Sequence, residues 1–256
     1  MSTRRVKLTV RYDGTDFRGW AAQLGQRTVQ GTLKEAVRQV SGEDVEIVGA
    51  SRTDSGAHAR GQVCHFDSAK PVKHWYQALN RALPLDVRVA KVELVAETFH
   101  SRFSAADRFY RYRILSDVSD PFRGRFAYMN RYVLDLDLMQ QAATFLEGEH
   151  DFRAFTEELG DSVENTVRKL FSIKVGRVRN EVRVDIVGTA FLRGMMRRIS
   201  GGLFEVGRGK RPLEDIQTLL SDQKHTLEWP EVLPARGLTL MEVRYGRHPR
   251  DNRLPK

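Results

Sequence analysis

Hydrophobic and polar residues alternate along several short stretches of the first half of the chain, and along others apolar residues recur every three to four positions. Alternation over residues 5–12 predicts a half-buried strand, and helical spacing after Thr28 predicts a helix capped by that threonine. The pattern predicts strand, helix, strand, strand, helix and strand at residues 5–12, 29–40, 45–50, 61–67, 72–83 and 87–93. This is the order of a ferredoxin-like unit.

The second half can be interpreted in the same way. A strand at 109–115 or 127–133 precedes a helix that Asp135 can cap and Gly148 can end. The remaining pattern predicts strands at 167–175, 181–188 and 238–245, and helices near 190–206 and 212–220. We therefore expect an α+β fold of two ferredoxin-like βαββαβ halves, residues 1–105 and 106–256, with mixed or antiparallel sheets flanking a central cleft.

The formal charge of +9 at pH 7 makes a polyanion the expected partner. Nucleic acid ranks ahead of a membrane, because the sequence shows no amphipathic anchor and no apolar run of about 18 residues. The basic residues from Arg244 to Lys256 are interpreted as a mobile arm. Cys64 is the single cysteine, and the N-terminus lacks an apolar signal core, so we expect a cytoplasmic protein without disulfides.

The segment Gly49–Ala59 holds the densest set of reactive side chains, including Arg52, Asp54 and His58. It connects two predicted strands, and loops on a rigid scaffold often carry function. Asp54 could be a nucleophile or base, a turn carboxylate bonded to backbone amides, or an ion-pair partner of Arg52. A cation within about 4 to 6 Å would keep this carboxylate ionised, which suits a nucleophile better than a general acid. His58 is interpreted as a residue that braces the loop.

Other reactive motifs are weak. The seven histidines include no pair at the His-x-x-x-His spacing of a helical metal site, so a metal site is disfavoured. The sequence also lacks the Gly-x-Ser-x-Gly elbow of hydrolases, the Rossmann motif and the Walker loop. Hydrolase and nucleotide-cofactor chemistry are therefore disfavoured.

Aromatic and basic residues alternate at 108–113. In a strand, Tyr110 and Tyr112 would share one face, and Phe109, Arg111 and Arg113 would share the other. Both an ordinary amphipathic strand and a surface that stacks nucleobases beside phosphate-binding cations would have this pattern.

A second basic segment, residues 191–199, is expected to begin a helix that buries Phe191 and two methionines. Arg193 and Arg197 lie four residues apart and would share one helix face. Either arginine could point into the cleft or be solvated. An arginine buried on so apolar a helix would require a carboxylate partner, and Asp54 is the candidate.

Short motifs, in order along nearly the whole chain, resemble those of the TruA family of tRNA pseudouridine synthases. The most specific is Arg-Thr-Asp-x-Gly-x-His at residues 52–58. The others are Tyr12-Asp13-Gly14-Thr15 with Gly19-Trp20, and the segments 100–105, 110–112, 145–152, 191–197 and 237–240. Two positions depart from the family pattern: Ala21-Ala22 precede Gln23, where Gln usually follows Gly-Trp directly, and Ala57 replaces a common valine.

This resemblance implies that Asp54 is the catalytic carboxylate and that Arg197 is its salt-bridge partner. Tyr110 would pack on the target uracil, and Arg52 would help to position the flipped nucleotide or its phosphate. The family converts uridines at positions 38, 39 and 40 of the tRNA anticodon stem-loop to pseudouridine. Its members are homodimers with a basic cleft between two α/β halves, and they use no metal or small-molecule cofactor. The expected partner is thus tRNA, with no role for a membrane.

The reaction breaks the N1–C1′ bond, turns the uracil and forms a C5–C1′ bond. Asp54 could attack C1′, add to C6 of the uracil or take a proton from C2′. Two other classes compete with this interpretation. A non-catalytic RNA-binding protein would also be basic, and a glycosidase would also break the bond but normally needs a second carboxylate.

Overall fold

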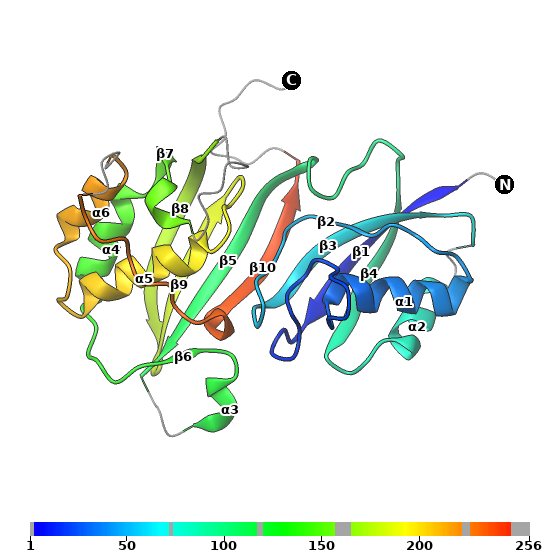
Figure 1. The fold of residues 1–256 in the computed structure, drawn as a ribbon, viewed down its shortest axis with the longest axis horizontal. Helices are drawn as coiled ribbons and strands as arrows, with labels where there is room; N and C mark the ends of the chain where they lie inside the picture. Colours follow the sequence, from blue (N-terminus) through cyan, green and yellow to red (C-terminus); the bar gives the residue numbers. More distant parts are fainter. Residues whose placement is uncertain (1–2, 72–73, 117–119, 157–164, 222–225, 247–256) are drawn as a thin grey trace. The chain divides into compact units, whose positions relative to one another are not determined.

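The computed structural model describes residues 3–71, 74–116, 120–156, 165–221 and 226–246. Contacts between Cα atoms divide the chain into two units, of which the first comprises Met1–Ala106 with Thr239–Gly246 and the second contains Asp107–Leu238. Each unit combines helices with strands, so the predicted α+β class is confirmed (Figure 1). The predicted basic arm begins at Arg244, but Arg244 belongs to the strand Leu238–Tyr245, so the prediction is wrong for this residue; the arm from residue 247 onward lies outside the described residues.

The first unit has the predicted order of elements. They are β1 (Arg4–Tyr12), α1 (Val29–Ser41), β2 (Val48–Gly49), β3 (His58–Ser68), α2 (Trp75–Ala82) and β4 (Val87–Val95). β1 pairs antiparallel with β3 on one side and with β4 on the other, and the short β2 pairs antiparallel with β3. Helices α1 and α2 lie on the same face of this sheet (Figure 1). The ferredoxin-like arrangement predicted for this half is confirmed.

The core of the first unit follows from the alternation in β1. Val6, Leu8 and Val10 are wholly buried, and the strand register places Val6 opposite Phe66 and Leu8 opposite Cys64 of β3. Apolar residues at helical spacing on α1 are likewise buried: Val29, Leu33, Ala36 and Val37. The side chain of Thr28 caps this helix by accepting a hydrogen bond from Gly31 N, as predicted.

The last strand, β10 (Leu238–Tyr245), occupies the residues predicted for it. From Thr239 onward it belongs to the first unit, where Thr239 and Leu240 pair in parallel with His58 and Ala59 of β3. The sequence pattern indicated this strand but not its partner. Parallel pairing between segments far apart in the chain has no local sequence signal.

The second unit is built on the antiparallel strand order β5-β9-β8-β7, and β6 pairs in parallel with the end of β5. Helix α4 contacts β8, α5 and α6. The elements are β5 (Ala105–Leu115), α3 (Pro121–Gly124), β6 (Tyr128–Met129), α4 (Leu136–Phe145), β7 (Gly148–Asp151), β8 (Val167–Val178), β9 (Glu181–Gly188), α5 (Met195–Gly207) and α6 (Leu213–Leu219). None of the described helices is both long and apolar enough to span a bilayer.

Two predicted helix boundaries in this unit are wrong. Helix α4 ends at Phe145, and Gly148, with φ of 108°, opens β7 instead of ending the helix. Helix α5 begins at Met195, because Gly194 takes a left-handed conformation with φ of 68° at the N-cap position. Arg193 therefore precedes the helix, and the prediction that it shares a helix face with Arg197 is also wrong.

Candidate active site

Asp54 lies on the loop that connects β2 to β3 in the first unit. Ala50 N at the start of this loop donates to Val63 O at 2.8 Å. The buried side chain of Gln62 donates to Ser51 O at 2.7 Å and accepts from Ser51 N at 3.3 Å. A side-chain amide thus imitates one more pair of strand hydrogen bonds and holds the loop against β3.

The segment between β1 and α1 holds the loop from its other side. Trp20 N donates to Thr53 O at 3.0 Å, and Gly56 N donates to Phe17 O at 3.3 Å. Gly19 has φ of 86°, and a Cβ atom there would lie 2.7 Å from Thr53 O, closer than real Cβ atoms approach backbone. The Gly19-Trp20 motif is therefore explained by its close contact with the residue that precedes Asp54.

The same segment is bound to the N-terminus of α1. Val29 N donates to Gly19 O at 3.2 Å, and Gln30 N donates to Trp20 O at 3.0 Å. These amides are among those that a helix leaves without intrahelical partners, so the helix end provides a fixed attachment for the segment. A chain of backbone contacts thus runs from α1 through Gly19-Trp20 to Thr53.

His58, the first residue of β3, is buried and braces the loop, as predicted. Gly14 N donates to His58 Nδ1 at 3.0 Å, which requires that nitrogen to carry a lone pair and places the ring proton of the neutral tautomer on Nε2. Asp13 Oδ1 lies 3.2 Å from the same nitrogen but accepts from the amide and hydroxyl of Thr15 at 3.1 and 2.6 Å. The backbone fixes the direction of the Gly14 N–H. We therefore conclude that His58 Nδ1 accepts from Gly14 N and does not form an ion pair with Asp13.

Arg52 and Asp54 share this loop without forming an ion pair in the described part of the chain. Asp54 is partly exposed, and its main-chain carbonyl accepts from Ala57 N at 3.1 Å to close a turn. Arg52 is exposed. The interpretation of Asp54 as a structural ion-pair partner of Arg52 is thus wrong for this structure, and the guanidinium of Arg52 is accessible to a phosphate.

Tyr110 lies on β5 in the second unit, with its side chain only 3% exposed. Its ring meets that of Phe191 edge to face, with centroids 5.1 Å apart and planes at 78°. Tyr112 shares its face of the strand and donates through its hydroxyl to Pro234 O at 2.7 Å. Burial raises the pKa of Tyr112 above its ordinary value, so the phenol stays protonated.

The other face of β5 carries Arg111 and Arg113, as the alternation predicted. Arg111 forms two hydrogen bonds of 2.6 Å with Asp185 of β9, and these bonds raise the pKa of Arg111. Its guanidinium also lies 5.6 Å from the centroid of the Phe109 ring. Because Arg111 is paired within the strand ladder, this face fits the amphipathic-strand interpretation better than a phosphate site beside Tyr110.

Arg197 lies in the first turn of α5 and is partly buried. Its Nε donates to Leu233 O at 2.7 Å, which fixes the direction of the guanidinium. Met195 and Met196 are buried beside it, as predicted. The first unit thus carries Arg52 and Asp54 on one loop, and the second unit carries Tyr110 on β5 and Arg197 on α5.

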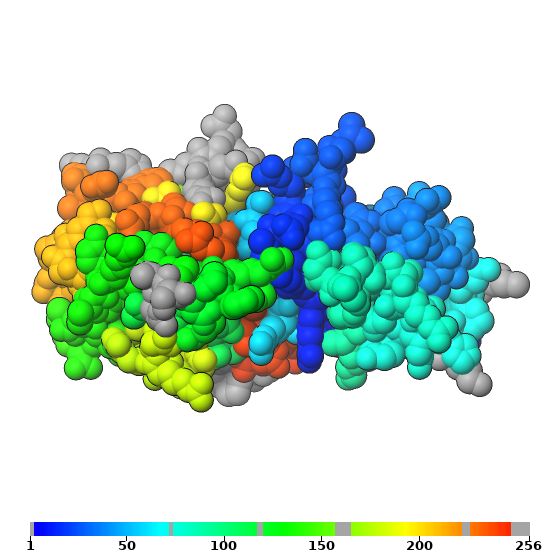
Figure 2. Space-filling view, turned by 90° about the horizontal axis from the view of Figure 1, so that it is seen from below, coloured from blue at the N-terminus to red at the C-terminus, as the bar shows by residue number. Residues whose placement is uncertain are grey.

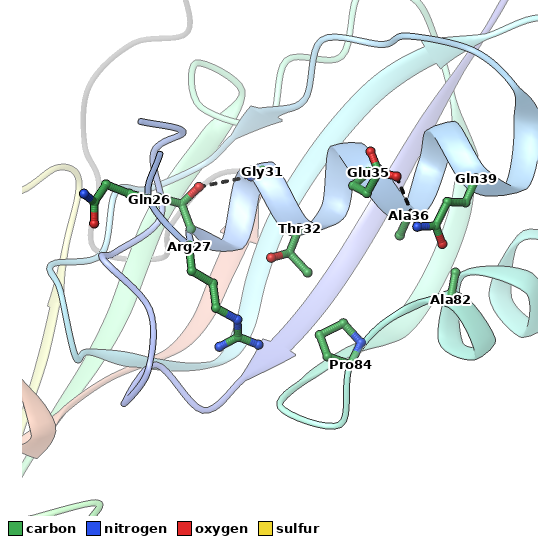
Figure 3. Close-up of a pocket in the computed structure, with 10 residues that line it drawn as sticks. Gln26, Arg27, Gly31, Thr32, Glu35, Ala36, Gln39, Ala82 and Pro84 are labelled. Carbon is green, nitrogen blue, oxygen red and sulfur yellow. Dashed lines mark hydrogen bonds between the residues drawn. The ribbon is translucent and has the colours of Figure 1, made fainter. Parts of the chain in front are cut away.

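A shallow groove of about 360 Å³ lies elsewhere on the first unit, along α1 (Figure 3). Glu35 and Gln39 of α1 line it, hydrogen-bonded to each other at 3.1 Å, and Pro84 closes it from the chain after α2. Sequence motifs gave no sign of this groove, and it contains none of the predicted site residues. Among the described residues, no group of three or more His, Cys, Asp or Glu side chains is arranged to hold a metal ion.

The sequence of the chain matches the model of a protein family described as tRNA pseudouridine synthase, over residues 8–104 and 142–246. These ranges contain Arg197, the Asp54 loop and the segment that holds this loop. The chain belongs to the tRNA pseudouridine synthase family, which makes it an isomerase that acts on tRNA. The family resemblance predicted from the motifs is confirmed.

Individual relatives are similar over nearly their full length. The chain is 42% identical over 247 residues to the tRNA pseudouridine synthase A of Brevibacillus brevis, covering 94% of this chain and 100% of the relative. It is 40% identical to the enzyme of the same name from Lactobacillus delbrueckii subsp. bulgaricus, covering 98% of each chain. The enzyme from Syntrophotalea carbinolica is 41% identical, with coverage of 94% and 96%.

Proposed function

We propose that the chain converts uridines 38, 39 and 40 of the tRNA anticodon stem-loop to pseudouridine, with Asp54 as the nucleophilic carboxylate. The observation that carries the proposal is the attachment of the Asp54 loop. Thr53 is held at its carbonyl by Trp20 N, and its hydroxyl lies 2.8 Å from Tyr12 OH in the core. A carboxylate that must reach one carbon atom benefits from such a rigid support.

Three other residues have proposed roles in binding the flipped nucleotide. Arg52, exposed on the same loop, binds its phosphate. Tyr110 packs on the uracil, and the contact with Phe191 keeps its ring in one orientation. Arg197, held by its hydrogen bond to Leu233 O, pairs with Asp54. The motifs that resemble those of the TruA family, in which these three residues stand, support the assignments.

The chemistry requires one proton to be moved and no net change in composition. The N1–C1′ bond breaks, C5 bonds to C1′, the proton on C5 leaves, and N1 receives a proton. A uridine in a stem must first leave the base stack, which costs a few kcal/mol. A single carboxylate can start the reaction by attacking C1′, by adding to C6 or by removing the C2′ proton. We further propose a cytoplasmic homodimer that needs neither metal nor small-molecule cofactor.

Carbodiimide mapping of an anticodon stem-loop transcript tests the proposal. The purified chain is expected to produce pseudouridine at positions 38 to 40, and Asp54→Asn is expected to abolish the product while the RNA remains bound. Asp16→Asn is a matched control, because Asp16 is an exposed carboxylate on the neighbouring segment. Turnover by Asp54→Asn would reject the nucleophile, and product only at other uridines would reject the assigned positions.

The same reactions separate the competing classes and routes. Release of free uracil would indicate a glycosidase, and binding without any modified uridine would indicate a non-catalytic RNA-binding protein. Deuterium at C2′ of the target ribose distinguishes the proton-removal route, since a primary isotope effect is expected only when that C–H bond breaks in the rate-limiting step.

A further inference from the structure

The sequence Gln23-Leu24-Gly25-Gln26 forms a β-turn at the tip of the segment between β1 and α1. Gln26 N donates to Gln23 O at 3.2 Å, and Gly25 takes φ of 69° at the third position, where such turns favour glycine. The turn places Leu24 in the solvent with 103% of its reference surface exposed. The segment that contains it, coloured blue, projects at the top of the surface view (Figure 2).

Several hydrogen bonds hold the base of this turn. Arg18 N donates to Arg27 O at 2.8 Å and joins the two arms of the segment. Ala22 N donates to Gln30 Oε1 at 2.7 Å, and Gln30 Nε2 donates to Ile47 O at 2.6 Å, which ties one arm to α1 and to the chain before β2. The exposed leucine is therefore presented on an anchored support.

The other arm is anchored by its arginine. The Arg27 guanidinium lies 4.0 Å from the centroid of the Phe17 ring and forms hydrogen bonds of 3.0 and 2.9 Å with Asp86. In the groove view its side chain extends away from α1 (Figure 3). Both arms of the turn are thus fixed to the body of the first unit.

The turn follows shortly after Gly19, the residue that packs against the loop carrying Asp54. Gly19, where a Cβ atom would lie 2.7 Å from Thr53 O and 3.3 Å from Asp54 C, precedes Leu24 by only five residues. Five extended residues span at most about 18 Å, so Leu24 lies no farther than that along the chain from the glycine that packs against the Asp54 loop.

Leu24 has no evident role in the fold. It is fully exposed, and a β-turn does not require leucine at its second position. A stem-loop that loses one base from its stack exposes the faces of the neighbouring bases, and proteins that distort helical nucleic acids often insert Leu, Ile, Met or Phe at such a step. Resting on the proposed function, we propose that Leu24 is a positioning residue that inserts into the stack of the RNA stem beside the flipped uridine.

The chain itself supplies a matched control. Leu85 is 91% exposed on a different loop of the same unit, and no insertion is assigned to it. Leu24→Ala and Leu85→Ala both remove an exposed leucine, so both variants are expected to fold with unchanged Tm. Leu24→Met keeps an apolar side chain of similar size and is expected to restore insertion.

Two RNA substrates reveal where Leu24 acts. Carbodiimide mapping first identifies a uridine that the wild-type chain modifies. One substrate is a stem-loop that contains this uridine, and the other is a linear RNA with the same uridine but no complementary strand. Leu24→Ala is expected to lower kcat/KM on the stem-loop about tenfold or more, because unstacking is no longer compensated. Turnover of the linear RNA, where the base is already unstacked, should change less than about twofold.

A fluorescent base reports the insertion directly. The RNA carries 2-aminopurine beside the target uridine, and the Asp54→Asn variant binds it without turnover. Binding of this variant is expected to raise the 2-aminopurine emission. The double variant Asp54→Asn, Leu24→Ala is expected to lose most of that rise. Three results would each overturn the inference: Leu24→Ala lowers kcat/KM equally on both RNAs, Leu85→Ala lowers kcat/KM on the stem-loop as much as Leu24→Ala does, or the double variant shows the same emission as Asp54→Asn. A change in oligomeric state in Leu24→Ala, with normal turnover of the stem-loop, would assign the leucine to a protein contact instead. Failure of the wild-type chain to modify any uridine would reject the proposed function, an outcome distinct from all of these.

Discussion

Trp20 and Thr53 are joined backbone to backbone, with Trp20 N donating to Thr53 O at 3.0 Å. This contact places the segment after β1 directly against the residue that precedes Asp54. Further hydrogen bonds join the segment to α1 and the loop to β3. Function at Asp54 should therefore be sensitive to changes in residues that never touch the substrate.

Gly19→Ala is expected to impair both stability and turnover. The added Cβ would meet Thr53 O at 2.7 Å, and the residue would keep φ of 86°. We expect a loss of roughly 2–4 kcal/mol in the free energy of unfolding, measured with denaturant, and a lower kcat. Gly42→Ala has the same positive φ problem but open space around the Cβ, so it should cost about 1 kcal/mol and leave kcat unchanged.

Gln62→Leu is expected to displace the start of the Asp54 loop. The variant leaves the amide and carbonyl of Ser51 without their side-chain partner at a partly buried position, which should cost about 1–3 kcal/mol of stability. Turnover should fall even under conditions where the variant is fully folded. Gln39→Leu, at an exposed position on α1, provides the comparison. Equal kinetics for the two variants would contradict the positioning role of Gln62.

Tyr110 should act through its ring more than through its hydroxyl. Tyr110→Phe preserves the edge-to-face contact with Phe191, so kcat should remain within about tenfold of the wild-type value. Tyr110→Ala removes the surface proposed to pack on the uracil and should lower kcat/KM at least about a hundredfold. Steady-state kinetics on a stem-loop transcript measure both values. A larger loss in Tyr110→Phe than in Tyr110→Ala would overturn this interpretation.

His65 should make the fold less stable in mild acid. Burial, followed by the charges of Arg5 and His100, lowers the pKa of His65 from 6.5 to about 4. Ser101 N donates to its Nδ1 at 3.2 Å, which also favours the neutral ring.

The sign of this effect follows from proton binding. Between these pKa values the unfolded chain binds a proton that the folded chain does not, so the free energy of unfolding should fall as the pH decreases from about 6.5 to 4. The contribution is at most about 3 kcal/mol. Denaturant titrations at several pH values should show a shallower slope for His65→Asn than for the wild-type chain. An identical slope would mean that His65 does not cause the acid sensitivity.

Much of the first unit could be predicted from local patterns. The alternation in β1 and the helical spacing after Thr28 each reflect geometry within a few residues, and both elements formed where expected. The start of α5 was placed too early, because the pattern of apolar residues around 191–199 does not reveal that Gly194 adopts a left-handed conformation. Periodicity indicates which face is apolar, but it does not locate the residue at which a helix begins.

The sequence by itself determined the order of the elements, the family and the candidate carboxylate, since these depend on local periodicity and on short motifs. Only the tertiary structure decided why Gly19 is required and how the loop is held. Gly19 must approach Thr53, and Gln62 must reach Ser51, through contacts that form only when β1, α1 and β3 pack together. Such contacts depend on distances in space between residues that are separated along the chain, which a linear pattern does not specify.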